Sequence, residues 1–502
     1  MSKRHGIWSF AVLLLALSAA WGQDSSAQPS SAQQGSAQSP AQQPADDMPT
    51  TNPQQPVPAF GQNSPTPSIS ENPPISGLDL PNLEPHGAPL SYLQAGAHIS
   101  ESVDSNVENS LGGSATRSIS RGLGSLDLQR LWSNYDLSLN YLGGVGYYDV
   151  KGLGFKQIEE LGFQQKITWK RGQLGIRDAF SYQPEGTFGS SYGSVSTTGA
   201  GLQGSSTFLN GQGLGELGQV PRIMNIAALD LVETLTPKSS VTVTGGYGFV
   251  HFLGNDPDLG TSFIGNSQVS GEIGYNRVLG PHDQAAIVYA YRGFQFSTGV
   301  NFHSHVIQLM WGHRISGRMD FLISAGPQFT QINNLDTVVG PENDLRIGAA
   351  GRVSLRYRFP RLVLELSYQH YLTTGSGFFA GAESDIVRLT ASHPLTRVWT
   401  LDTDIGYSRN SRVLPVTCPE GQTCPGVSAD IYQYGFAGFS VHRMFGRNYR
   451  VYASYQFNGL EFDNSYCTAA TAGETGGPCN RTSQRHIGTI GFDWTPRPIR
   501  LD

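Results

Sequence analysis

The sequence is poor in charge, in cysteine and in long apolar runs. Only 14% of its 502 residues are charged, and four are cysteine. Low charge combined with few helix-forming residues excludes a coiled coil or a helical bundle. After residue 22 there is no apolar run long enough for a second membrane-spanning helix, which needs about 20 residues. A net charge of −6 argues against nucleic acid as a partner, because a broad basic face would be required.

Glycine and aromatic residues are abundant instead. The chain has 61 Gly, 24 Phe, 21 Tyr and 7 Trp, which is too aromatic for a wholly disordered protein. The length allows a large core or one large barrel.

Residues 1–22 have the pattern of a secretory signal peptide. Lys3 and Arg4 precede an apolar run over 7–20, and Ala20 and Gly22 supply small residues for a cleavage site. The alternative is an uncleaved anchor helix, although the apolar run is short against the roughly 20 residues that a span needs. No cysteine stands directly after the run, so nothing indicates a lipoprotein anchor. We therefore expect a mature chain that begins near residue 23, outside the cytoplasm.

Residues 23–88 form a tract rich in Gln, Ser, Ala and Pro. The tract has six acidic residues, no Lys or Arg, and few large apolar side chains that could build a core. Such a composition predicts a disordered leader, which an exported chain would hold in the periplasm. A segment that binds peptidoglycan or a periplasmic partner is the functional alternative, and no motif supports it.

From residue 89 onward, apolar and polar residues alternate. The segments 135–141, 240–244, 362–368 and 399–407 all show this period of two. Period two places successive side chains on opposite sides of a strand, so these segments are predicted strands with two unlike faces.

Short and long connections between the predicted strands also alternate. Eight short turns are expected at 133–134, 171–172, 237–238, 281–282, 316–317, 360–361, 396–397 and 446–448. Nine longer connections are expected at 103–117, 149–157, 183–223, 253–267, 295–303, 331–343, 372–384, 409–430 and 458–485. This rhythm gives 18 strands, and 16 is the alternative count. The long 183–223 loop could either fold into a lumen or remain a surface loop.

Two bands of aromatic residues accompany this rhythm. One band flanks the short turns, at Trp132, Tyr135, Trp169, Phe359, Trp399, Phe445 and Tyr449. The other lies at the far strand ends, at Tyr147, Tyr182, Phe252, Tyr291, Phe329, Tyr407 and Phe457. Aromatic girdles of this kind mark the two interfaces of a bilayer, and a sheet can span a bilayer only if it closes. We therefore predict an all-β fold, with residues 89–502 forming a single transmembrane antiparallel β-barrel.

The chain resembles a family at this point. Its leader, its strand rhythm and its run from Ile490 to Trp494 look like those of Gram-negative outer-membrane β-barrels. The run Ala97-His-Ile-Ser-Glu-Ser-Val-Asp-Ser-Asn106 is similar to the first strand of porins linked to exopolysaccharide export. The resemblance implies a bacterial outer-membrane location, contact with lipid, and recognition by the barrel-assembly machinery. Such barrels usually end on an aromatic residue, whereas this chain continues past Trp494 through Pro496 and Pro498, which should stop the strand.

The four cysteines fall into two local pairs within predicted outer loops. We expect disulfides between Cys418 and Cys424 and between Cys467 and Cys479, because disulfides persist outside the cytoplasm. Cross-paired bonds between the two loops remain open. A four-cysteine zinc site is the other reading, which the absence of a CxxC spacing disfavours, so no metal site is predicted.

Charged residues gather on the predicted inner face of one group of strands. In 345–359 the odd positions are mainly apolar, so the arginines at even positions share the opposite face, where charge avoids lipid. Neighbouring strands add further charges to this face. It could guide polar or anionic solutes, or its charges could neutralise one another as cross-strand pairs. The candidate lumen-lining residues are Arg346, Arg352, Arg356, Arg358, Glu365, Arg388, Asp402 and Asp404.

These features indicate a channel rather than an enzyme. The Gly189–Gly193 match to GxSxG lacks the strand and helix that a nucleophile needs, so no catalytic residue and no cofactor are predicted. We expect passage of small polar solutes or saccharides through the lumen. The alternatives are a dedicated polysaccharide export conduit, a plugged structural or adhesive barrel, and an outer-membrane hydrolase, for which no suitable residue spacing is found.

Overall fold

The computed structural model describes residues 74–76, 91–106, 115–149, 154–184, 221–253, 263–333, 343–377, 379–414, 430–463 and 482–501. All of them belong to one compact unit, Asn52–Asp502. None of the helical residues in these ranges forms a helix long and apolar enough to cross a membrane.

Nearly all of the described residues lie in β-strands. A single 3-10 helix, η1 (Gly375–Gly377), follows the thirteenth strand. The strands are β1 (Tyr92–Asp104), β2 (Arg117–Leu131), β3 (Tyr135–Tyr148), β4 (Gly154–Trp169), β5 (Gly172–Gln183), β6 (Arg222–Thr236), β7 (Ser239–Phe252), β8 (Asn266–Val278), β9 (Asp283–Phe296), β10 (Asn301–Ser316), β11 (Met319–Asn333), β12 (Asn343–Phe359), β13 (Leu362–Thr373), β14 (Ala382–Pro394), β15 (Trp399–Arg412), β16 (Ile431–Phe445), β17 (Tyr449–Phe462), β18 (Thr482–Trp494) and β19 (Ile499–Arg500).

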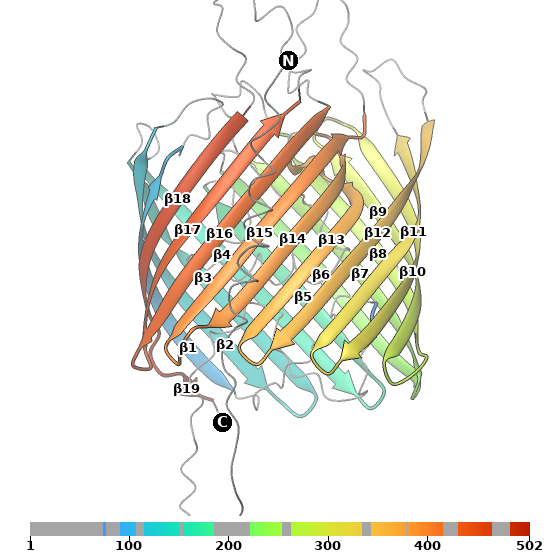
Figure 1. Cartoon of the computed structure of the whole chain (residues 1–502), viewed down its shortest axis with the longest axis horizontal. Coiled ribbons are helices and arrows are strands. Elements are labelled where there is room, and N and C mark those ends of the chain that lie inside the picture. The colour runs from blue at the N-terminus through green and yellow to red at the C-terminus, as the bar shows by residue number, and fades with distance from the viewer. Residues whose placement is uncertain are drawn as a thin grey trace, which may run out of the picture. The chain divides into compact units, whose positions relative to one another are not determined.

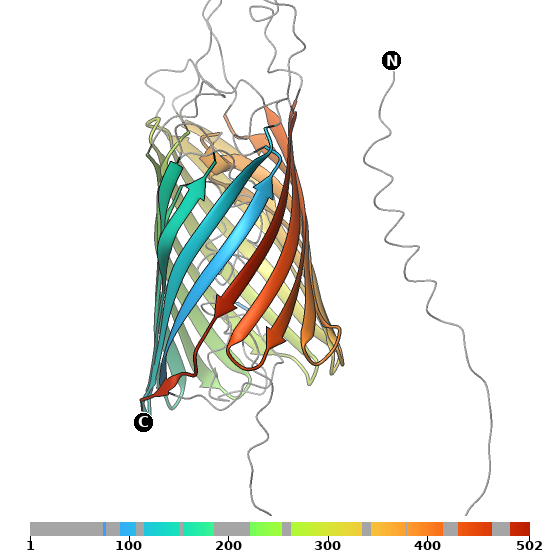
Figure 2. The ribbon, with the colours of Figure 1, turned by 90° about the vertical axis from the view of Figure 1, so that its left-hand side faces the viewer.

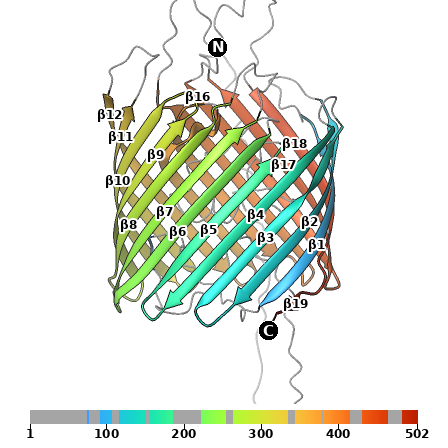
Figure 3. The same ribbon diagram turned by 180° about the vertical axis from the view of Figure 1, so that it is seen from behind.

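The first eighteen strands form a closed ring. Each pairs antiparallel with the next along the chain, and β1 pairs with β18 from Ala97 opposite Trp494 to Asp104 opposite Ile487. Closure gives every strand of the ring a neighbour on both sides, although residues 343–350 of β12 pair with β11 and not with β13. The chain is therefore a closed antiparallel barrel of 18 strands (Figure 1; Figure 3 shows the opposite wall). The predicted all-β barrel is confirmed, with 18 strands and not 16.

The eight expected short turns join consecutive strands at one rim, at the bottom of the barrel in Figure 1. One connection at the opposite rim, which we call the outer rim, is much shorter than the predicted 295–303 loop. β9 and β10 are joined by four residues, with Gly299 at φ 85° and its amide donating to the carbonyl of Phe296 over 3.0 Å. Glycine adopts this left-handed conformation without steric cost, so a tight hairpin forms where alternation alone indicated a long loop.

The chain returns to the barrel after its last long strand. β18 ends at Trp494 as expected, and Pro496 and Pro498 lie in the following gap. The short β19 then pairs with the beginning of β1, with Tyr92 opposite Arg500 (Figure 2). The segment beyond Trp494 thus extends the closing seam at the short-turn rim, which the sequence did not indicate.

The two faces of the barrel have opposite character. Outward-facing side chains such as Ile307 and Leu309 are 45% and 68% exposed, whereas inward-facing Thr242, Ser304 and Asn410 are buried. A soluble protein would bury its apolar face. An apolar exterior around a polar interior is the arrangement of a barrel that stands in lipid.

The aromatic band at the short-turn rim lies on the outer surface. All seven predicted members are exposed: Trp132, Tyr135, Trp169, Phe359, Trp399, Phe445 and Tyr449. In the second band Phe252 differs from expectation, because it stacks on Phe263 with ring centroids 5.1 Å apart and touches Gly377. Phe252 therefore packs with the loop after β13 rather than in a lipid-facing girdle.

Candidate functional site: the lumen of the barrel

Cross-strand ion pairs occupy the inner face of β12 to β15. Arg356 on β12 lies 3.2 Å from Glu365 on β13. Arg388 on β14 binds Asp404 on β15 through two hydrogen bonds of 2.9 and 2.6 Å, and the Asp404 carboxylate is buried. Planar two-point contact of a guanidinium with a carboxylate is the stronger geometry for such a pair. Four of the eight candidate residues are thus joined as two ion pairs.

Three other candidates have polar partners or lie near a rim. Asp402 accepts a hydrogen bond of 2.7 Å from Ser392 and lies 3.3 Å from Nδ1 of His442. Arg346, near the outer end of β12, donates to the backbone carbonyl of Val413. Arg358 is half-buried beside the short turn that follows β12. These residues lie at several heights along the wall, so the candidates form a ladder rather than one cluster.

Arg352, the remaining candidate, is deeply buried. Only 4% of its surface is exposed, and its Nε has no hydrogen-bond partner among the described residues. Arg292 on β9 shares both properties, and its guanidinium lies over the ring of Tyr371 on β13, 5.7 Å from the centroid. Both guanidinium groups act electrostatically on the buried Tyr371 hydroxyl. Two buried cations and one hydroxyl donor form a region of the wall that can attract an anion.

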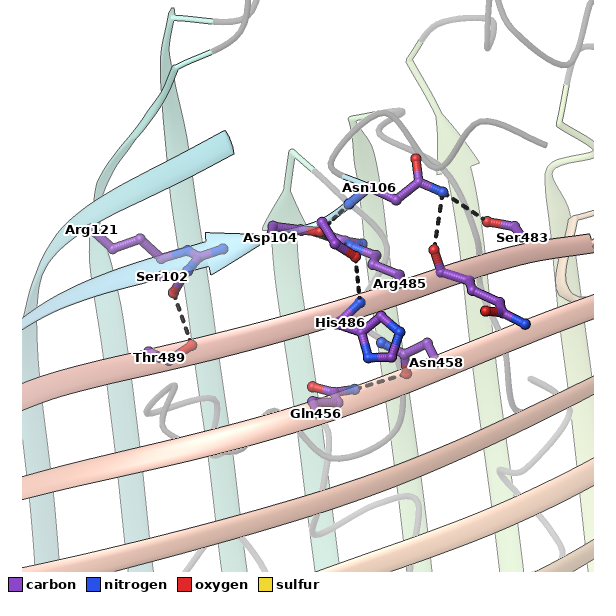
Figure 4. Close-up of polar contacts among 12 residues, drawn as sticks. Ser102, Asp104, Asn106, Arg121, Gln456, Asn458, Ser483, Arg485, His486 and Thr489 are labelled. Atoms are coloured by element: carbon purple, nitrogen blue, oxygen red, sulfur yellow. Dashed lines mark hydrogen bonds and ion pairs between the residues drawn. The ribbon is translucent and has the colours of Figure 1, made fainter. Parts of the chain in front are cut away.

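A second polar cluster lies at the closing seam (Figure 4). Nε of Arg485 on β18 donates to Asp104 on β1 over 2.7 Å, and both side chains are buried. The amide nitrogen of the Asn106 side chain donates to Ser483 over 3.2 Å, and the hydroxyl groups of Ser102 and Thr489 are 2.9 Å apart. These contacts link the first and last long strands near the outer rim.

The same seam carries another charged group nearer the short turns. Asp493 on β18 contacts Nδ1 of His98 at 2.9 Å and Nε of Arg450 at 2.6 Å. The other ring nitrogen of His98 lies 2.9 Å from the Ser125 hydroxyl. β1, β2, β17 and β18 are therefore tied together by side chains as well as by backbone hydrogen bonds.

Sequence reasoning missed these seam residues and Arg292. Asp104 and Arg485 are 381 residues apart, and their pairing appears only when the register of β1 against β18 is known. Arg292 and Tyr371 lie on strands that are not neighbours in the sheet, so no local pattern brings them together. The available signal was alternation: Asp104, Arg292 and Arg485 all occupy polar positions of strands that otherwise alternate. That pattern gives the face of a residue but not its partner.

The loop between β13 and β14 packs across the outer mouth. The carbonyl of Gly377 accepts a 2.9 Å hydrogen bond from Ile264, just before β8, and Phe379 packs on Tyr432 of β16 at 5.1 Å. Residues next to β8 and on β16 are thus both contacted by a loop that starts at β13. We name residues 374–377 and 379–381 the inner loop.

Aromatic side chains hold the inner loop in place. Phe379 is buried and lies under the guanidinium of Arg412, 4.4 Å from its ring centroid. Gly381 has φ 86°, and a Cβ there would lie 2.2 Å from the ring of Phe302. The wall and the loop therefore fit closely only because residue 381 has no side chain. The loop 183–223, which could have filled the lumen, lies outside the described residues apart from its ends.

The remaining expectations concern residues outside the described ranges. Cys418, Cys424, Cys467 and Cys479 belong to this group, as do 1–22, Gly189–Gly193 and most of 23–88. Within the described ranges, no group of three His, Cys, Asp or Glu side chains is arranged so that it could hold a metal ion.

No protein-family model and no curated protein matches the sequence. Solved barrels match in fold. Pseudomonas aeruginosa OccK2 (OpdF) is 9% identical over 80% of this chain and 98% of its own, with a TM-score of 0.39. Pseudomonas aeruginosa OpdL is 9% identical over 82% and 99%, with a TM-score of 0.37. A bacterial polysaccharide outer membrane secretin is 9% identical over 80% and 98%, with a TM-score of 0.31. The fold resembles that of outer-membrane barrels.

Proposed function

We propose that the chain is a porin-like channel of the bacterial outer membrane that passes small polar solutes or saccharides. One observation carries the proposal: a closed ring of 18 strands has apolar residues outside and polar residues inside. Barrels of about 16 to 18 strands leave an aqueous channel. Outer-membrane lipid would contact the exposed apolar face, and the barrel-assembly machinery would insert a chain whose last long strand ends on an exposed Trp494.

The paired charges favour a water-filled lumen in which the wall exerts little net electric field. Arg356 with Glu365 and Arg388 with Asp404 cancel as pairs, yet their polar atoms can order water and receive hydroxyl groups of a solute. Arg292 and Arg352 are different, because their Nε atoms have no partner among the described residues. They would give the channel a preference for anionic over cationic solutes of equal size. Diffusion through such a lumen involves no chemical step and needs no cofactor.

Planar-bilayer recording of the purified full chain tests the proposal. A steady, ohmic conductance that favours anions is the expected result. If the protein is β-rich and heat-modifiable but shows no conductance in bilayers, the barrel fold stands and the channel proposal is overturned. Liposome swelling with neutral and acidic monosaccharides would then compare solutes of equal size. Faster swelling with the acidic sugar is expected, and equal rates would contradict the anion preference.

A further inference from the structure

A short segment that precedes the barrel in sequence lies against the barrel's inner wall. Within residues 23–88, the structure describes only Pro74, Ile75 and Ser76. Ile75 is 3% exposed and Ser76 is 2% exposed, although the surrounding sequence has too few large apolar residues to build a core. Something in the barrel therefore covers both residues.

Ser76 is held by polar groups of β7 and β8. Its backbone amide donates to Asn276 Oδ1 over 3.0 Å, and the Asn276 side-chain amide donates back to the Ser76 hydroxyl over 2.7 Å. The Ser76 hydroxyl also lies 2.5 Å from Oγ1 of Thr242. Thr242 and Asn276 are themselves buried, so both the backbone and the side chain of Ser76 are satisfied by the wall.

Ile75 packs on an apolar patch of the inner wall. Ala286 and Val288 of β9 are buried with it, and Met310 of β10 and Leu322 of β11 pack against the same group. Apolar residues that faced an aqueous lumen would be unfavourable by the hydrophobic effect. Covering by Ile75 explains why four apolar residues occur together on this part of the inner face.

Two glycines make room for the segment. A Cβ at Gly274 would lie 2.4 Å from the Ser76 hydroxyl oxygen, and a Cβ at Gly312 would lie 3.1 Å from Cγ2 of Ile75. Both glycines are on the inner face, so the wall is hollowed where the two residues lie. Shape, hydrogen bonding and apolar contact therefore all match at one place, which we name the leader seat.

The leader seat lies at the short-turn mouth. Thr242 is close to the beginning of β7, while Asn276 and Gly312 are close to the ends of β8 and β10. All three strand ends are at the rim of short turns, opposite the rim that the inner loop covers. The leader seat and the inner loop thus lie at opposite mouths of the lumen.

We propose that residues 74–76 are a built-in ligand of the barrel, held in the leader seat to restrict its short-turn mouth. The restriction rests on the proposed channel function, whereas the seat itself does not. Displacing the segment would widen the mouth and leave the strands unchanged. The leader would then regulate the channel.

Photo-crosslinking tests the seat directly. Photo-methionine, which is close to methionine in size, replaces Met310 and the other five methionines of the full chain, and Met310 packs against the cluster that contains Ile75. Illumination should join residue 310 to a peptide containing residues 74–76, identified by mass spectrometry. Gly274→Val and Gly312→Val should abolish this crosslink. Gly175→Val on β5 is the control, because its Cβ would have only the Asp230 carbonyl oxygen nearby, at 3.8 Å. A missing crosslink in the unmodified chain would overturn the seat.

Bilayer conductance tests the restriction. Gly312→Val and Ile75→Asp should raise the conductance about twofold or more, and Gly175→Val should not. Loss of the crosslink with unchanged conductance would overturn the restriction. If neither the unmodified chain nor any variant conducts, the channel proposal fails and the restriction fails with it, while the crosslink still decides the seat.

Discussion

Asp104 and Arg485 form a buried ion pair between the first and the last long strand of the barrel. Nε of Arg485 is 2.7 Å from Asp104 Oδ2, and the other carboxylate oxygen accepts the backbone amide of Asn106 over 3.0 Å. The side chain of Arg485 is 3% exposed and that of Asp104 is 0% exposed. The pair therefore connects β1 to β18 near the outer rim, where closure of the ring joins the chain's most distant strands.

Removing one partner of this pair should weaken the barrel. Arg485→Met leaves the Asp104 carboxylate buried without its cation, which typically costs about 3–5 kcal/mol. The temperature at which the folded, heat-modifiable band disappears on a gel should fall clearly. Asp402→Asn is the control, because Asp402 is 33% exposed and such a contact contributes at most about 1 kcal/mol. Equal shifts in the two variants would show that the seam pair has no special role.

Arg352→Gln should reduce the anion preference of the channel. Arg352 is buried, and its Nε has no partner among the described residues, whereas Arg388 binds Asp404 at two points, so the charge of Arg352 is less completely offset. The reversal potential in a salt gradient measures the ion selectivity of the channel. In the variant this selectivity should shift toward cations. Arg409→Gln is the matched control, since Arg409 is exposed on the outer face of β15. If the reversal potential shifts equally in the control, the change in ion selectivity does not arise from a charge in the lumen.

Much of the barrel followed from local patterns. Alternation gave the strands and their faces because each residue's side is fixed by its neighbours in the same strand. Short turns gave the count, since Ser133-Asn134 or Pro360-Arg361 interrupts the alternation without any long-range information. The ion pair of Arg356 with Glu365 was foreseeable for the same reason: one short turn separates the two strands.

The contacts that could not be predicted depend on distant parts of the chain. Asp104 with Arg485, Phe379 with Tyr432 and Ser76 with Asn276 are fixed by closure and by packing inside the lumen. Composition alone predicted that residues 23–88 form a disordered leader. Ile75 and Ser76 nevertheless fit a hollow in the inner wall that no local pattern reveals. The short hairpin at Gly299 was missed because a single left-handed residue can replace a longer loop.

Neighbouring substitutions on β10 should have opposite consequences. Ile307 is exposed to the outside near the middle of the strand, and Gln308 faces the lumen. Ile307→Lys places a charge in lipid, which costs about 2–4 kcal/mol at the bilayer midplane. Gln308→Lys should be tolerated. The folded fraction after refolding into lipid vesicles measures both, and similar losses would contradict the assigned faces.

Gly381→Val should displace the inner loop and widen the outer mouth. Residue 381 has φ 86°, which a β-branched residue rarely adopts, and its Cβ would meet the Phe302 ring at 2.2 Å. The loop must move, but the strands on either side keep their hydrogen bonds, so we expect a higher conductance with the barrel intact. Gly446→Val is the matched control: it also has a left-handed φ, 64°, yet nothing lies near its Cβ. It should strain a short turn and lower stability without changing the conductance. Equal conductance changes in both variants would show that backbone strain, and not the contact with Phe302, governs the outer mouth.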